Sequence, residues 1–121
     1  MKYLLLIHHE EGFWQALTES ERQETFDQLA KLRERLASRG QYVDCSQLQP
    51  TTAAARIQVR NGEDLVTDGP FAETHEQLGG YLLIDVGTMA EAIAIGKQIP
   101  LVRNGTVEVR PLVEQAAKAS A

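Results

Sequence analysis

Apolar residues in the first third of the chain follow two different spacings. Residues 3–8 form an apolar run of a length typical of a buried strand, and the exit loop after it carries Phe13 and Trp14. Between Thr18 and Gly40 apolar side chains recur at helical spacing, Thr18 and Glu21 form a capping box, and Gly40 supplies a stop. We therefore predict a strand followed by the longest helix of the fold.

The middle of the chain favours strands and a hairpin. Residues 41–48 can return as a strand. Residues 55–60 alternate between apolar and polar positions up to Asn61-Gly62, a dipeptide typical of two-residue hairpin turns. Residues 63–67 are expected to be the second strand of this hairpin.

The last third repeats the order strand, helix, strand. Residues 80–86 are predicted to form a strand, and Thr88 with Glu91 repeats the capping pattern before a helix that should end at Pro100. Residues 106–112 then close the sheet. This order predicts an α+β fold, a ferredoxin-like split βαβ sheet with an extra hairpin and two helices on one face.

Length and composition agree with one domain. The 121 residues, 43% of them hydrophobic, suffice for a single core but not for two. We expect the domain to span residues 1–113 and residues 114–121 to form a frayed tail.

Both faces of the first strand are apolar, which predicts a partner. Tyr3, Leu5 and Ile7 point one way, whereas Leu4 and Leu6 point the other. Two helices cover only one face of such a sheet, and the other would leave an apolar patch that monomers rarely expose. We predict a homodimer with these sheet faces packed together.

Charge and cysteine content narrow the choice of partners and compartment. The net charge is −5, with 12 Lys and Arg against 17 Asp and Glu, which argues against a nucleic-acid partner. Cys45 is the only cysteine, so an internal disulfide is excluded. The apolar run at residues 4–7 is too short for the core of a signal peptide. We expect a cytoplasmic protein without membrane contact.

The segment from 65 to 85, LVTDGPFAETHEQLGGYLLID, is where we expect the functional site. Its DGPF tetrapeptide predicts a tight turn in which Gly69 takes a positive φ and Pro70 fixes the exit. The Gly79-Gly80 pair would allow a backbone or a ligand to approach closely. Ionisable side chains lie between these two features.

Asp68 is the first catalytic candidate. A carboxylate held beside Pro70 and Phe71 can be partly desolvated, which raises its proton affinity toward that of a general acid or base. The alternative is a residue that only shapes the turn. His8 and His9 are the other catalytic candidates, because the end of the first strand can approach this loop and place one histidine beside Asp68.

A metal or cofactor site is not expected. Adjacent strand residues project to opposite faces, so His8 and His9 cannot easily share an ion, and no spaced set of His or Cys ligands is present. The chain also lacks a Walker loop, a dinucleotide fingerprint and a nucleophile elbow.

Four further residues are candidates for ligand binding. Glu73 can orient a ligand or the catalytic carboxylate, with a solvated face as the alternative. His75 can be a surface substitution or, if it acts, supply a titrating partner for an anionic group. Arg110 can clamp a carboxylate or pair with an acidic neighbour. Phe71 can line a small apolar pocket or anchor a core or dimer contact.

The sequence DGPFAETHEQLGGYLLI resembles the signature of the YCII-related family, in the branch named after DGPF. The resemblance extends to the start, MKYLLLI, and to IPLVRNGTVEVRP near the other end. It implies a dimeric α+β barrel with a ferredoxin-like core, and it supports the pairing of a histidine with Asp68. His75 departs from the family pattern, in which a lysine commonly follows the threonine.

Two functions remain open, together with a purely structural role for the turn. One is a cofactor-free enzyme that uses Asp68 and a histidine to move a proton on a small organic acid or carbonyl compound. The other is a non-catalytic small-molecule-binding or regulatory module, in keeping with the association of DGPF proteins with sigma-factor systems. Convergence of Asp68, a first-strand histidine and Arg110 on one pocket would favour chemistry or ligand binding. Their divergence would remove the physical basis of the acid-base hypothesis.

Overall fold

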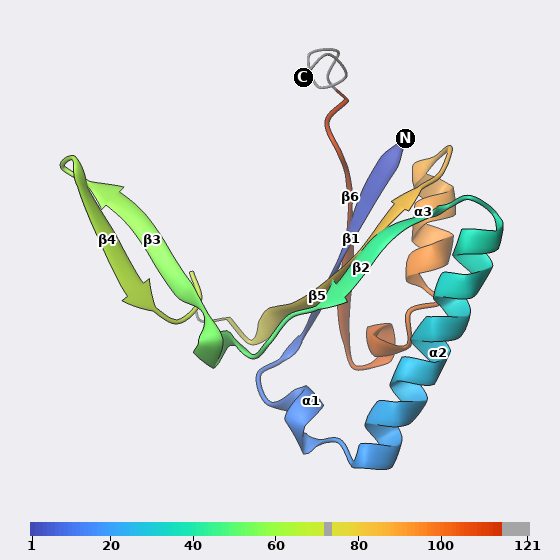
Figure 1. The fold of residues 1–121 in the computed structure, drawn as a ribbon, viewed down its shortest axis with the longest axis horizontal. Helices are drawn as coiled ribbons and strands as arrows, with labels where there is room; N and C mark the ends of the chain where they lie inside the picture. The colour runs from blue at the N-terminus through green and yellow to red at the C-terminus, as the bar shows by residue number, and fades with distance from the viewer. Residues whose placement is uncertain (72–73, 115–121) are drawn as a thin grey trace.

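The computed structural model describes residues 1–71 and 74–114 (Figure 1). In chain order its elements are β1 (Lys2–Glu10), α1 (Phe13–Ala16), α2 (Glu19–Ser38), β2 (Tyr42–Gln47), η1 (Thr51–Ala53), β3 (Ala55–Arg60), β4 (Glu63–Asp68), β5 (Glu76–Asp85), α3 (Met89–Gly96), η2 (Pro100–Arg103) and β6 (Gly105–Pro111). Among the helices of these residues, none is both long and apolar enough to cross a membrane.

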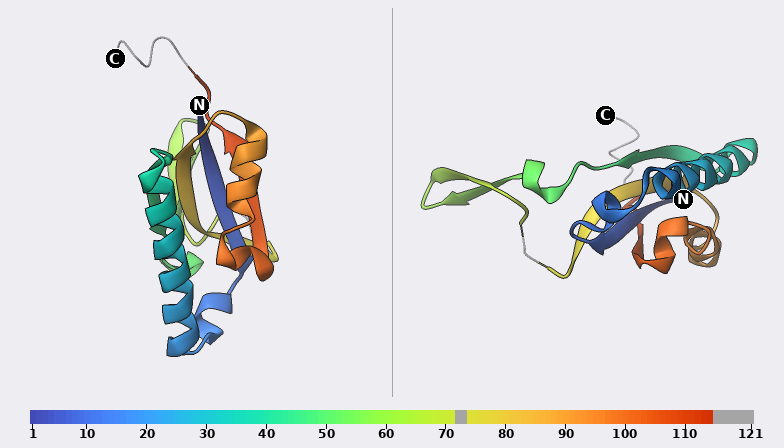
Figure 2. Two further views of the ribbon diagram at one scale, coloured as in Figure 1. Left: turned by 90° about the vertical axis from the view of Figure 1, so that its right-hand side faces the viewer. Right: turned by 90° about the horizontal axis from the view of Figure 1, so that it is seen from below.

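The predicted α+β fold is confirmed. Four strands form an antiparallel sheet in the order β2-β5-β1-β6, which is the ferredoxin-like order, and β3 pairs only with β4. Helices α2 and α3 lie on the same side of the sheet (Figure 2). The core between these helices and the sheet contains the fully buried side chains of Leu5, Leu36, Ile84 and Ile99.

Helix α2 begins where its capping box predicts. The Thr18 hydroxyl accepts a hydrogen bond from the Glu21 amide at 3.1 Å, and the Glu21 carboxylate accepts one from the Thr18 amide at 2.9 Å. These hydrogen bonds lower the pKa of Glu21. Gly40, with a φ of 68°, follows the end of the helix. Leu32 and Leu36 are buried on the side that packs toward the sheet.

The β3–β4 hairpin forms an arm that projects away from the body (Figure 1). Its turn is the predicted Asn61-Gly62 pair, with φ angles of 52° and 77°. Ile57 pairs with Val66 on one face of this arm, and they are 71% and 66% exposed. The arm therefore presents an uncovered aliphatic face in the single chain.

Three predicted boundaries were wrong. Residues Phe13–Ala16 form helix α1, where a loop was expected. Strand β5 begins at Glu76 rather than at residue 80, because both glycines are accommodated within the sheet, Gly80 pairing with Ile7 and Gln47. Helix α3 ends at Gly96, and Pro100 instead begins the 3₁₀ turn η2. The predicted tail at 114–121 lies outside the described residues from 115 onward.

Candidate ligand cavity

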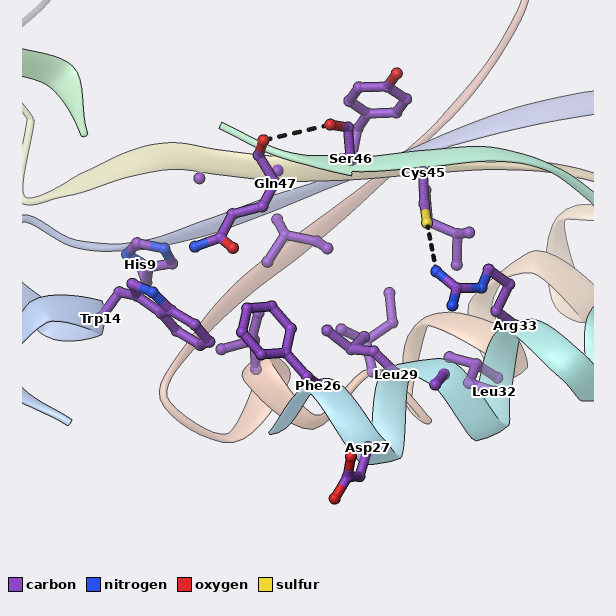
Figure 3. A pocket seen from close by; sticks show the side chains of 18 of the residues that line it. His9, Trp14, Phe26, Asp27, Leu29, Leu32, Arg33, Cys45, Ser46 and Gln47 are labelled. Carbon is purple, nitrogen blue, oxygen red and sulfur yellow. Dashed lines mark hydrogen bonds between the residues drawn. The ribbon is translucent and has the colours of Figure 1, made fainter. Parts of the chain in front are cut away.

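A cavity of about 450 Å³ lies between the helix-covered face of the sheet and α2. It extends to α1 and to the edge strand β2, and Figure 3 shows its lining from close by. Much of this lining is aliphatic or aromatic, including Ile7, Trp14, Phe26, Leu29, Leu82 and Leu101. The cavity is thus enclosed by the side chains of β1 and β5 that face the helices and by the side of α2 that faces the sheet.

Helix α1 supplies one wall of the cavity through Trp14. The Trp14 and Phe26 rings pack edge to face with their centroids 5.1 Å apart. Arg22 of α2 donates hydrogen bonds to the carbonyl oxygens of Leu17, at 2.7 Å, and Trp14, at 3.3 Å. These bonds fix the short helix against the longer one and hold the indole at the cavity.

His9 reaches the cavity because its ring lies against Gly79, the residue of β5 left unpaired where the register shifts between the Ile7–Gly80 and His8–Leu78 pairs. A Cβ atom at Gly79 would clash with Nε2 of His9 and lie 2.9 Å from its Cδ2. The imidazole therefore occupies the space that any other residue at position 79 would fill. Nδ1 of His9 lies 3.2 Å from the Glu10 carbonyl oxygen. The ring centroids of His9 and Phe13 are 5.5 Å apart. The predicted close approach at the glycine pair is made by this histidine at Gly79 and by the backbone of β2 at Gly80.

Polar side chains gather where β2 faces α2. Tyr42 donates a hydrogen bond to Sγ of Cys45 at 3.4 Å, and this bond is the main cause that raises the pKa of Tyr42. Arg33 extends from α2 toward Cys45, with Nη1 4.0 Å from Sγ (Figure 3). Ser46 follows Cys45 in the lining along β2, whereas Gln47 extends toward His9 at the opposite end (Figure 3). The end formed by Arg33 and Cys45 can hydrogen-bond a polar ligand group.

His8 and Arg110 lie on the sheet face that the helices leave open. Nε2 of His8 is 3.7 Å from one oxygen of Glu108, and Nε of Arg110 is 3.6 Å from the other. His8 and His9 thus project to opposite faces, as strand geometry predicts. Among the described residues, no three His, Cys, Asp or Glu side chains are grouped so that they could hold a metal.

The remaining candidates that the structure describes lie away from the cavity. Asp68 ends β4 and is exposed, and Gly69 has the predicted positive φ of 94°. Phe71 is 80% exposed. Nε2 of His75 lies 2.6 Å from Oε1 of Glu10. Glu73 lies outside the described residues.

Within one chain, the candidate residues therefore occupy separate places. His9 is the predicted candidate that lines the cavity, and Asp68 and Arg110 do not line it. The dyad of Asp68 with a histidine stays a prediction, and this cavity does not bring Asp68 together with His9 or Arg110.

The profile of the YCII-related domain matches residues 1–116, nearly the whole chain. The chain belongs to the YCII-related family. An uncharacterized protein of Rhizobium meliloti (strain 1021) is 35% identical over 114 residues, which are 93% of this chain and 92% of that protein. The YCII-related match therefore covers both the cavity and the DGPF turn.

Proposed function

We propose that this YCII-related protein binds a small organic molecule in the cavity between the sheet and α2. The observation that carries this proposal is the cavity itself, whose volume of about 450 Å³ and largely apolar lining suit a small ligand. His9 and Gln47 lie at one end, and Cys45 of β2 with Arg33 of α2 lies at the other (Figure 3). Such a site orients an apolar body through a few polar contacts.

His9 is the group that we propose for proton transfer. Imidazole exchanges protons readily near neutral pH, and apolar neighbours keep water away from a bound carbonyl compound or organic acid. The contact of Nδ1 with the Glu10 carbonyl oxygen favours the proton on Nδ1. That tautomer leaves the Nε2 lone pair as the base.

The predicted dimer is part of this proposal. Leu4, Leu6 and Leu83 are half-buried on the open sheet face, where a second copy would cover them. In such a dimer the arm offers a route by which Asp68 of one protomer reaches a histidine of the other. The DGPF tetrapeptide supports assignment to the DGPF branch, and the single cysteine supports a cytoplasmic location.

A non-catalytic regulatory module, linked to sigma-factor systems, is the second candidate. The exposed aliphatic face of the arm favours it, because Ile57, Val59 and Val66 are each at least 60% exposed. Such a surface is typical of a site that docks a protein. In this case the cavity ligand would regulate docking rather than react.

Trp14 makes the ligand test direct, because it is the only tryptophan and it lines the cavity. A panel of small organic acids and carbonyl compounds would be titrated while Trp14 fluorescence and the melting temperature are measured. A cavity ligand should change the fluorescence and raise the melting temperature. Ala30→Phe should abolish both responses by filling the cavity, since Ala30 is part of its lining.

Two further variants separate binding from catalysis. His9→Gln should keep most of the affinity but lose turnover of any compound that reacts, whereas Lys97→Gln, an exposed change outside the lining, should alter neither. Ligand responses that persist in Ala30→Phe would place binding elsewhere and reject the proposal. Turnover that survives His9→Gln would reject the role of the imidazole.

A further inference from the structure

Arg33 brings a positive charge to the polar end of the cavity. It lies on α2 and its guanidinium extends across to Cys45 of β2 (Figure 3). Its hydrogen bond to Sγ, at 4.0 Å, is long, and among the described residues no other hydrogen bond or ion pair involves this side chain. A guanidinium has several N–H donors in one plane. Most of them are therefore available to a ligand.

Asp27 is the acidic residue of the lining, and it does not offset this charge inside the cavity. Its Oδ1 accepts a hydrogen bond from Gln23 of the same helix at 2.9 Å. Figure 3 shows its carboxylate pointing away from the other lining side chains, whereas Arg33 extends toward β2. The charge presented to a ligand at this end is consequently positive.

We infer that the cavity takes an apolar monocarboxylate whose carboxylate binds the Arg33 guanidinium. This inference rests on the proposed function and deepens it. A guanidinium matches a carboxylate through two parallel hydrogen bonds, and these are stronger than hydrogen bonds between neutral groups. The apolar body then lies over Leu29 and Phe26, and the far end of the molecule faces His9.

The negative net charge of the chain separates the effect of Arg33 from a general attraction of anions. At −5, the chain as a whole repels anions, so general attraction does not explain binding of a carboxylate. Because the hydrogen bond from Arg33 to the Cys45 thiol is long, its replacement by one to a carboxylate costs little free energy. Selectivity for acids over neutral analogues should therefore depend on this one side chain.

The test compares matched acids, amides and amines. Straight-chain monocarboxylates from butyrate to decanoate and 3-phenylpropionate, with the corresponding primary amides and amines, would be titrated against Trp14 fluorescence. In the wild type, acids should bind about tenfold more tightly than their amides. Arg33→Gln should remove this difference by weakening the acids about tenfold and leaving the amides unchanged.

Arg35→Gln is the matched control. It removes the same charge from the same helix, but the Arg35 guanidinium donates to Oε1 of Gln98 at 3.2 Å and lies outside the cavity lining. This control should keep the preference for acids. Equal binding of acids and amides, or tighter binding of amines, would overturn the assignment of Arg33 while leaving the cavity as a binding site. If no acid, amide or amine of the panel binds, this inference is rejected, and the proposed function is rejected with it if the carbonyl compounds of the first panel do not bind either.

Discussion

Gly79 and Gly80 are adjacent, but a side chain at each position would meet a different part of the protein. A Cβ at Gly79 would meet the ring of His9, a side chain that can move, whereas a Cβ at Gly80 would lie 2.9 Å from the backbone oxygen of Ser46. Gly80→Ala should therefore push β2 from β5 and lower the free energy of unfolding by about 1–3 kcal/mol. Gly79→Ala should change it by less than about 1 kcal/mol.

The same pair tests the position of His9. Gly79→Ala should displace the imidazole, shift its NMR resonances and weaken cavity ligands, although the protein stays folded. Urea unfolding measures the free energy of unfolding of each variant. The His9→Gln variant identifies which NMR resonances belong to the His9 imidazole. Equal loss of stability in both alanine variants would contradict the contact of His9 with Gly79.

At the scale of elements, β2 and β5 are joined by a side-chain bond as well as by their backbones. The Tyr81 hydroxyl donates to the Asp44 carboxylate at 2.8 Å, and this bond is the main cause that raises the pKa of Tyr81 above its ordinary value. The folded-state pKa lies above the unfolded one. The stabilisation is therefore complete below the ordinary tyrosine pKa and is lost as pH rises through the folded value.

Asp44→Asn should lower the pKa of Tyr81 toward the ordinary value, because the negative charge is gone. Tyrosinate absorbance during an alkaline titration measures this shift, and Tyr81→Phe identifies the step that belongs to Tyr81. The free energy of unfolding of the wild type should fall over the same pH range as Tyr81 ionises. This Tyr81-dependent fall should be absent in Asp44→Asn. Superimposable titrations of wild type and Asp44→Asn would count against the hydrogen bond.

Elements with strong local signals were predictable from the sequence. The capping box at Thr18 marked the start of α2, and Asn61-Gly62 placed the hairpin turn, because both signals act within a few residues. Helix α1 carried no comparable signal. It has four residues, its preceding residue Gly12 provides no side-chain cap, and contacts of Arg22 hold it against α2.

The cavity was only partly predictable for a related reason. The sequence singled out the glycine pair and two first-strand histidines, but only the structure shows which histidine Gly79 accommodates. Arg33 had no distinguishing signal, because a charged residue on a long helix is typical of a solvated face. Its role depends on β2, which brings Cys45 opposite it.

For the whole molecule, the uncovered sheet face predicts a homodimer. Light scattering at micromolar concentration should give twice the 13.4 kDa mass of one chain. Leu6→Glu should shift the mass toward the monomer by placing a charge on the open face, whereas Ile93→Glu should leave the dimer intact, because Ile93 is exposed on α3. A monomeric wild type would refute the predicted sheet-face dimer.

The central position of β1 also governs the timing of folding during synthesis. This strand is translated before most of the chain, yet its two neighbours are β5 and β6, which lie near the other end of the sequence. Pairing over such sequence separations slows folding, and the strand remains without its neighbours while the ribosome completes most of the domain. A nascent chain stalled before β5 would therefore expose the most apolar strand of the fold to chaperones.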